Sequence, residues 1–372
     1  MKNTMAIIFA YKNDEQLKAL TQLRTVSSLP VAGRYRVVDF SLSNLVNSGI
    51  TKVGMITRSN YQSLMDHVGS GKEWELSRKR DGLYMLPPFS QQDSVGLNSR
   101  GRVEALINAL TFIRKSSSEY IILHDSDSIF NTTYDDMLKY HKEKDADITV
   151  MYQHGDFAPE ANEETCYFQF NEDGRIIDVA IDPTTGRENR SIGVVIMKKT
   201  LLESLIHDCA SHNLVSFRRD ILQRRVNDLK IYGYRYDGYI SSISTIASYF
   251  KANMDILDPK VRDELFYKEH TIQTKIRDEV PTVYRGNSRV KNSLIADGCV
   301  IEGTVENSII FRGVHIRKGA VVQNSIIMQD SEIQDGSQLN YVITDKDVVI
   351  RENRKLYGFE LFPMVLSKGS VV

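Results

Sequence analysis

The first 258 residues alternate short apolar runs with helix-like stretches. Runs rich in Ile and Val and flanked by polar residues predict β-strands, and they lie at 6–10, 52–57, 120–124, 147–152 and 191–197. Apolar residues spaced as on one helix face predict helices at 60–68, 102–115, 134–144 and 240–256, with a basic helix at 216–228. This alternation is typical of an α/β domain whose mostly parallel sheet is covered on both faces.

A second pattern begins at residue 283. Branched apolar residues recur every five or six positions, at Val290, Ile295, Ile301, Val305, Ile310, Ile316, Val321, Ile327, Ile333 and Leu339. The unit Asn-Ser-apolar-apolar at 292–295 recurs at 307–310 and 324–327, with a variant at 340–343, so the offsets are 15, 17 and 16 residues. A hexapeptide β-helix takes about 18 residues per coil and stacks its branched residues into an apolar column. The repeat favours this fold over the alternative, an antiparallel sandwich.

The domain boundaries are placed where the sequence changes from the first pattern to the second. Pro259 and Pro281 enclose a charged stretch. We therefore expect one domain at 1–258, a linker at 259–282 and a β-helix domain at 283–372. A chain of 372 residues is long enough to form two cores.

Composition narrows the class of protein. Lys and Arg number 47 and Asp and Glu 48, so the net charge of -1 gives no bulk attraction to nucleic acid or to an anionic membrane. Cys166, Cys209 and Cys299 are far apart and offer no paired metal or redox motif. No apolar stretch approaches the roughly 18 residues of a membrane span. We expect a cytoplasmic protein.

Several segments, in order, resemble the ADP-glucose pyrophosphorylase (glucose-1-phosphate adenylyltransferase) family of bacterial glycogen synthesis. They are PVAGRYRVVDFSLSNLVNSGITKVGMIT at 30–57, Arg100-Gly101, YISSISTIASYFKANMDIL at 239–257 and the hexapeptide tail. The resemblance implies a Rossmann-like nucleotidyltransferase domain of the GT-A type, followed by a left-handed parallel β-helix. It also implies the conversion of ATP and glucose 1-phosphate to ADP-glucose and pyrophosphate. That chemistry needs a phosphate cradle, cations near the triphosphate and carboxylates that hold Mg²⁺.

The nucleotide-binding part of this pattern is damaged. The family loop A-G-G-x-G-x-R-L-x-P-L-T aligns without a gap to residues 10–21. Its glycines allow backbone N–H groups to approach phosphates closely, but Tyr11, Lys12 and Asp14 replace them, and Gln16 replaces the arginine. The following R-A-K-P segment keeps Arg24 but has Val26 in place of lysine. Of the family's nucleotide-binding residues, the resemblance implies that this chain retains Arg24, Arg100 and Gly101.

The metal site is half present. Asp127 matches the family's catalytic, metal-binding aspartate, and the partner aspartate is Ser242. Mg²⁺ binds through one or two carboxylates plus substrate phosphates. Asp127 could therefore hold a metal if Asp125 helps, although both could equally cap a loop. We expect Mg²⁺, the family cofactor, to be bound weakly or not required.

The sugar-phosphate pocket departs furthest from the family. Ile181 replaces a glutamate that holds sugar hydroxyls, and Asp182 replaces a lysine that pairs with the phosphate. A carboxylate there repels the phosphate. Ser99 and Cys166 replace a tyrosine and a glycine, whereas Ser191 is retained. Two further family residues, a threonine and an aspartate, are replaced by Arg102 and Glu104.

Losses at the nucleotide, metal and sugar positions, beside intact scaffold segments, predict a non-catalytic or regulatory subunit. The chain is similar to the GlgD subunits of Firmicutes, which form a mixed tetramer with a catalytic subunit and raise its activity. A small anionic effector or nucleotide is a further possible ligand. Arg34 and Arg36 are candidates to bind such an anion or the carboxylates of a partner, although ion pairing at the surface is the more common role of such arginines.

Two alternatives stay open. An active nucleotidyltransferase with a rebuilt site would rely on Asp127, Arg24, Arg100 and Ser191. A hexapeptide acyltransferase would need His315 as base, but His315 lies in an alternating run that places it on an outer coil face.

Overall fold

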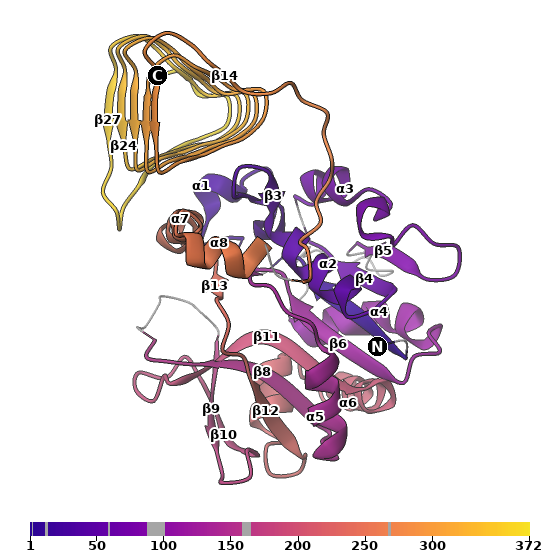
Figure 1. Ribbon diagram of the computed structural model, residues 1–372. Helices are drawn as coiled ribbons and strands as arrows, with labels where there is room; N and C mark the ends of the chain where they lie inside the picture. The colour runs from indigo at the N-terminus through magenta and orange to yellow at the C-terminus, as the bar shows by residue number, and fades with distance from the viewer. Residues whose placement is uncertain (2, 12–13, 59, 88–100, 158–164, 267–268) are drawn as a thin grey trace.

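The computed structural model describes residues 1–372 except 2, 12–13, 59, 88–100, 158–164 and 267–268. Figure 1 shows two parts, a layered α/β domain and a triangular β-helix that carries the C-terminus. The fold class predicted from the sequence, a nucleotidyltransferase-like α/β domain followed by a parallel β-helix, is confirmed. No described helix is both long and apolar enough to cross a membrane.

The α/β domain is built on a nine-stranded sheet. Its strands are β1 (Thr4–Phe9), β4 (Lys52–Ile56), β5 (Gly82–Leu86), β6 (Tyr120–Asp125), β8 (Ile148–His154), β9 (Cys166–Phe170), β10 (Ile176–Ile181), β11 (Asn189–Lys198) and β12 (Ile231–Arg235). β1 pairs in parallel with β4 and β6, β4 with β5, and β8 with β12. β11 is antiparallel to both β6 and β8. The predicted mostly parallel sheet is thus right for the pairs of β1, β4, β5 and β6 and of β8 with β12, and wrong for β11 and for the antiparallel β9–β10 hairpin, because an apolar run does not encode strand direction.

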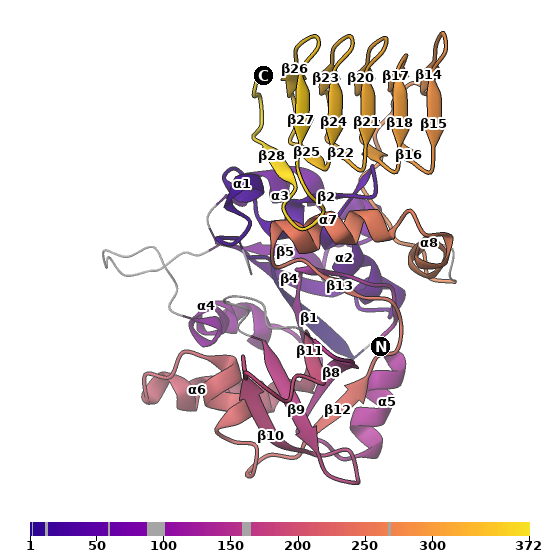
Figure 2. The same cartoon turned by 90° about the vertical axis from the view of Figure 1, so that its left-hand side faces the viewer.

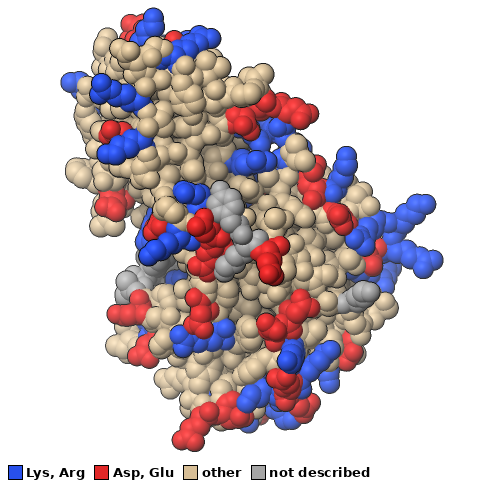
Figure 3. All heavy atoms as spheres, viewed as in Figure 1, with Lys and Arg blue, Asp and Glu red and all other residues tan. Residues whose placement is uncertain are grey.

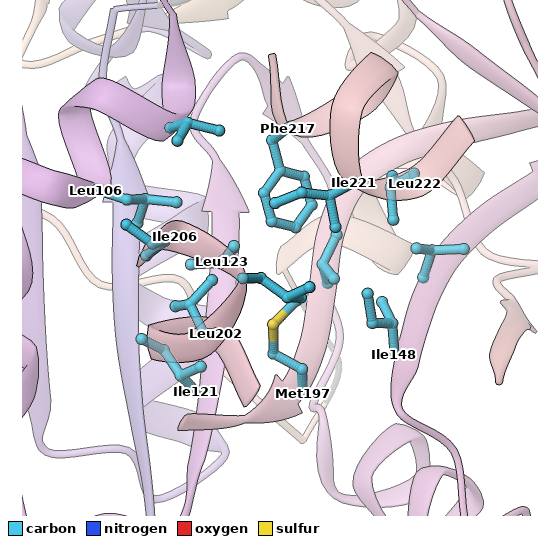
Figure 4. Packing of buried hydrophobic residues seen from close by; sticks show 14 of the residues in the cluster. Leu106, Ile121, Leu123, Ile148, Met197, Leu202, Ile206, Phe217, Ile221 and Leu222 are labelled. Atoms are coloured by element: carbon cyan, nitrogen blue, oxygen red, sulfur yellow. The ribbon is translucent and has the colours of Figure 1, made fainter. Parts of the chain in front are cut away.

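Helices cover both faces of the sheet, as expected. They are α1 (Lys18–Thr21), α2 (Val37–Asn47), α3 (Gln62–Val68), α4 (Arg102–Arg114), α5 (Asp135–Glu143), α6 (Lys199–Ser211), α7 (Ile246–Asp255) and α8 (Pro259–Phe266). Short turns of 3₁₀-helix, η1 (Val26–Ser28) and η2 (Lys72–Trp74), and a π-helix, η3 (Phe217–Gln223), complete the set. Alternate residues of β1 point to opposite faces and enter two separate cores. Figure 4 shows one of these cores, where Leu106, Leu202 and Phe217 meet.

The predicted helix at 240–256 begins later than expected. Ser241–Ser242 form a short strand, β13, that pairs with β7 (Ser128–Ile129). Thr245 caps α7, since its hydroxyl accepts a hydrogen bond from the Ser248 amide at 3.1 Å. The next helix along the chain, α8, occupies 259–266. The stretch predicted as a linker therefore begins with a helix.

Three five-stranded parallel sheets form the β-helix (Figure 2). The first contains β14 (Val283–Tyr284), β17 (Val300–Ile301), β20 (His315–Ile316), β23 (Glu332–Ile333) and β26 (Val349–Ile350). The second contains β15 (Arg289–Lys291), β18 (Thr304–Glu306), β21 (Val321–Gln323), β24 (Gln338–Asn340) and β27 (Lys355–Tyr357). The third contains β16 (Leu294–Ile295), β19 (Ile309–Ile310), β22 (Ile326–Ile327), β25 (Val342–Thr344) and β28 (Met364–Leu366).

One corner of the β-helix explains the repeated Asn-Ser unit. Asn292, Asn307 and Asn324 each adopt a left-handed backbone conformation, which asparagine tolerates better than most residues. In the fourth coil Tyr341, not Asn340, takes this conformation, because Ile326 pairs with Ile343. The predicted offset of 16 is therefore wrong by one residue. The prediction that Val321 lies in the core is also wrong by one residue, since its neighbour Val322 is the buried one.

The two parts meet along the outer face of the third sheet. Ile309, Ile326 and Ile343 share a core with Tyr249 and Phe250 of α7. The same core includes residues beside the two-stranded pair β2 (Pro30–Val31) and β3 (Tyr35–Arg36). A buried ion pair between Arg24 and Asp345 crosses this junction. The β-helix is therefore packed firmly against the α/β domain.

Candidate functional site

Ligands of open α/β sheets bind beyond the carboxyl ends of parallel strands, where the strand order reverses. In this chain that point lies between β1 and β6, because β4 and β5 lie to one side and β11 and β8 to the other. Phe9 and Asp125 are register partners at the two strand ends. The residues that follow them, Tyr11 and Asp127, are therefore at the place where a ligand is expected.

Two arginines occupy the space around Asp125. Its carboxylate is fully buried, and each oxygen has a different partner: Arg102 of α4 and, at 3.3 Å, Arg218 of η3. The Arg102 guanidinium also lies over the Phe9 ring, 4.4 Å from its centroid. Gly193 of β11 approaches so closely that a Cβ there would lie 2.7 Å from the Asp125 side chain. Asp125 is therefore committed to protein partners and is not placed to help Asp127 with a metal.

A third arginine lies over the neighbouring position, Tyr11. Tyr11, which stands where the family has the first loop glycine, packs edge-on against Phe9 with ring centroids 6.1 Å apart. The Arg58 guanidinium lies 4.1 Å from the centre of the Tyr11 ring. Burial raises the pKa of the Tyr11 hydroxyl. An aromatic side chain and an arginine thus fill the position where loop backbone would cradle phosphate.

The two metal positions of the family do lie together. Asp127 is buried directly after β6, and its carbonyl accepts a hydrogen bond from the Ile243 amide at 2.7 Å. Ser128 donates to the Asp127 carboxylate at 3.2 Å, and the Ser128 and Ser242 hydroxyls are 3.1 Å apart. Ser242 thus stands where the family has its second metal-binding carboxylate, and its hydroxyl is hydrogen-bonded to that of Ser128. One carboxylate and two hydroxyls are a poor ligand set for Mg²⁺.

Asp14 has a structural use in the altered loop. One of its carboxylate oxygens accepts a hydrogen bond from the Val26 amide at 2.7 Å, and its carbonyl accepts one from the Thr21 hydroxyl at 2.5 Å. Burial raises the pKa of Asp14 to about 7, although the Val26 amide lowers it. The loop is therefore held by side-chain contacts, not by glycine. Gln16 is half-buried in the same loop.

The sugar-pocket positions gather on the β9–β10 hairpin. Cys166 and Ile181 are register partners. Asp182 adopts a left-handed backbone conformation and its carboxylate accepts a hydrogen bond from the Thr165 amide at 2.7 Å, which closes the hairpin end. Ser191 of β11 accepts one from the Gly193 amide at 3.3 Å. The hairpin therefore uses Asp182 for its own geometry.

The remaining predicted residues are placed as follows. Arg24 points into the junction, where it pairs with Asp345. Gly101 starts α4, and a Cβ there would lie 2.2 Å from the Val215 carbonyl, so close packing alone requires glycine. Lys12, Ser99 and Arg100 lie outside the described residues. The described residues contain no group of three or more His, Cys, Asp or Glu that could hold a metal.

A second cluster of cations lies at the junction of the two parts. Arg36, Arg277, Arg312 and Lys346 act on one another electrostatically there, with Arg24 and Arg34 nearby. Burial and the neighbouring arginines lower the pKa of Lys346 to about 7. Burial lowers the pKa of Arg36 to about 10. The buried Asp345 carboxylate offsets part of this charge.

Comparisons with known proteins agree with this geometry. A nucleotidyl transferase family model matches residues 5–259, and a GlmU-like C-terminal hexapeptide model matches 280–359. The chain is 35% identical to the glycogen biosynthesis protein GlgD of Bacillus subtilis, over 95% of this chain and 93% of that protein. It belongs to the glucose-1-phosphate adenylyltransferase family of nucleotidyl transferases.

Geobacillus stearothermophilus provides two relatives of this family member. Its GlgD is 37% identical and its glucose-1-phosphate adenylyltransferase 32% identical to this chain, each over 87% of this chain and 84% of the relative. One organism thus carries two kinds of glucose-1-phosphate adenylyltransferase family chain, both with similarity along nearly the full length of this one.

Two site residues, Arg58 and Arg218, were missed by the sequence analysis, which took 216–228 as a basic helix without a role. One signal could have pointed to Arg218, which pairs with Asp125. A carboxylate that follows a fully apolar strand is buried, and buried carboxylates need cationic partners. The sequence does not say which arginines reach it.

Proposed function

We propose that this chain is a regulatory subunit of a glucose-1-phosphate adenylyltransferase in glycogen biosynthesis, and that it has little or no turnover of its own. One observation carries the proposal: both Asp125 oxygens are engaged by Arg102 and Arg218, while the second metal position beside Asp127 is Ser242. Adenylyl transfer needs carboxylates that are free to bind Mg²⁺ and a cradle for the triphosphate. We also propose that Mg²⁺ is not required by this chain.

The proposed mode of action is a shift of the partner's conformational equilibrium. A subunit raises its partner's activity only to the extent that it binds the active form more tightly than the inactive one. The proposal therefore requires a hetero-oligomer, which we take to be a mixed tetramer with the catalytic subunit in the cytoplasm. The three cysteines are buried free thiols, which fits a reducing compartment.

The first coil of the β-helix supports a contact with another subunit. β14, β15 and β16 are the terminal strands of their three sheets, so one edge of each lacks a strand partner within the described residues. Val283, Tyr284 and Val290 expose apolar surface at the same end. Exposed edge strands are normally covered.

An anionic effector at the junction is part of the same proposal. Arg312 is buried, and its Nε has no hydrogen-bond acceptor within the described structure. Burial and the nearby Arg34 and Arg277 lower the pKa of Arg312, so an anion placed there would relieve this repulsion. Figure 3 shows acidic and basic side chains mixed over one face of the molecule, which gives no broad basic surface there for nucleic acid.

The first experiment is an assay of pyrophosphate release from ATP and glucose 1-phosphate. It would use this chain alone, the catalytic subunit of the same organism alone, and a mixture of the two. We expect no measurable release by this chain and a raised rate in the mixture. Turnover by this chain alone that disappears in Asp127→Asn would contradict the proposal and establish an active, rebuilt site.

A further inference from the structure

The last coil of the β-helix is longer than the coils before it. Ile309 pairs with Ile326, and Ile326 with Ile343, so these coils take 17 residues each. Ile343 pairs with Val365, which makes the last interval 22 residues. The additional five residues lie between β27 and β28. Coil stacking does not require them, because the strands on both sides keep their register.

The inserted residues lie within a hydrogen-bonded hairpin at 358–363. Phe359 and Phe362 exchange two backbone hydrogen bonds, at 3.1 and 3.0 Å. Gly358 lies so close to the preceding coil that a Cβ there would be 2.3 Å from the Tyr341 carbonyl. Pro363 fixes the return of the chain toward β28. The hairpin is therefore ordered before it meets any partner.

Three large side chains of this hairpin are apolar and exposed. Phe359, Leu361 and Phe362 have exposed fractions of 74%, 72% and 78%, and none belongs to a core. Contiguous exposed apolar residues of this size commonly mark an interaction site. Aromatic anchors that enter a partner's pocket typically supply most of the binding energy of a protein interface.

We propose that the 358–363 hairpin is the anchor by which this chain docks onto the catalytic subunit, and this inference rests on the proposed function. Three side chains are too few to form a stable interface alone, so the hairpin acts within a larger contact. Figures 1 and 2 show the loop extending from the end of β27 toward the side of α7. A partner that grips it also lies beside the junction between the two parts of the molecule.

The chemistry of the hairpin favours a protein partner over a membrane. Its tip residue beside Leu361 is Glu360, whereas segments that insert into anionic bilayers carry Lys or Arg around their apolar residues. The partner follows from the proposed function, and the relatives support it, since one organism carries both a GlgD and an adenylyltransferase, each similar to most of this chain.

The test compares a double variant, Phe359→Ser with Phe362→Ser, with the wild type. Binding to the catalytic subunit would be measured by sedimentation at several concentrations. We expect the dissociation constant to rise at least about tenfold. Ile177→Ser is the matched control, because Ile177 is 51% exposed on β10, in the α/β domain, and should leave binding unchanged. Circular dichroism and the urea midpoint must be the same in all three proteins.

The remaining outcomes are distinguishable. If the wild type binds and the double variant binds equally well, the hairpin is not the anchor. If the double variant loses only self-association of this chain, the hairpin joins copies of this chain and the proposal is wrong. If the hairpin drives binding to phosphatidylcholine vesicles instead, a membrane takes the partner's place. If the wild type does not bind the catalytic subunit at all, the proposed function fails first.

Discussion

Asp125 is a buried carboxylate whose two oxygens depend on two different arginines. Removing one partner of a buried ion pair leaves an uncompensated charge and typically costs about 3–5 kcal/mol. We therefore expect Arg102→Met to lower the free energy of unfolding by about 3 kcal/mol. Urea denaturation followed by circular dichroism would measure it.

Arg114→Met is the control for this prediction. Arg114 lies at the end of the same helix, and its half-exposed guanidinium is 3.6 Å from Glu203. Exposed ion pairs contribute about 0–1 kcal/mol, so this variant should be nearly as stable as the wild type. Equal losses in the two variants would mean that Asp125 has no special dependence on Arg102.

Lys346 gives the junction a dependence on pH. Its pKa of about 7 lies far below its ordinary value, because it is partly buried and close to Arg36, Arg24 and Arg277, with Asp345 acting in the opposite direction. At pH 8 Lys346 is mostly neutral, and a bound anion would draw a proton onto it. We therefore expect binding of inorganic phosphate to take up protons at pH 8, and its affinity to fall as the pH rises above 7.

Calorimetry in two buffers of different ionisation enthalpy would measure this proton uptake. Lys346→Met should abolish it. Lys368→Met should not, since Lys368 is exposed and pairs with Asp347 at 3.7 Å. Phosphate binding without proton uptake in the wild type would show that Lys346 does not face the anion.

At the scale of single residues, the sequence predicted which positions belong to the site better than it predicted the contacts that their side chains make. Comparison with family segments located Tyr11, Asp127 and Ser242, and the structure brings Asp127 and Ser242 together. It could not show that Arg102 turns inward to Asp125, because a charged residue in the first turn of a helix is usually solvated. The contact depends on the approach of α4 to the end of β6, which no local pattern encodes.

Within the elements, the β-helix corner depends on a ladder of serine hydroxyls. The Ser325 hydroxyl accepts a hydrogen bond from the Val342 amide at 3.1 Å and donates one to the Gln323 carbonyl at 2.6 Å. Ser325→Ala would leave that buried amide without its acceptor, which costs about 1–3 kcal/mol. Thermal unfolding would measure the loss.

Ser293→Ala is the matched control, because Ser293 occupies the same place in the first coil. Its hydroxyl accepts from the Ser308 amide at 3.1 Å, but Ser293 is only partly buried, so water can replace the hydroxyl. We expect less than half the loss found for Ser325→Ala. Similar losses would show that burial of the corner does not matter.

The hexapeptide period predicted this domain well, since side-chain spacing alone fixes which residues enter the column. The errors arose where the spacing changes. Tyr341 occupies a left-handed position that asparagine fills in three other coils, and its ring lies 6.0 Å from Phe250 of α7. Packing of Tyr341 across the junction thus outweighs the local preference for asparagine. A sequence pattern does not reveal this, because it does not show which residues of α7 the corner will contact.

For the whole molecule, the Arg24–Asp345 pair joins the α/β domain to the β-helix. Both side chains are buried. We expect Arg24→Met to weaken the junction, so that calorimetry shows two unfolding transitions where the wild type shows one. Arg317→Met is the control, since its partly exposed pair with Glu332 lies within the β-helix. A single transition at an unchanged temperature in Arg24→Met would show that the shared apolar core alone couples the two parts.

The structural uses of the altered site residues have a consequence for the history of such a chain. Asp14 holds the Val26 amide, Asp182 closes a hairpin and Arg102 pairs with the buried Asp125. Replacing any one of them by the residue of a working enzyme removes a contact that the fold now uses. Single steps toward catalysis therefore lower stability before they add any activity, and such losses act as a ratchet that makes the change of role hard to reverse.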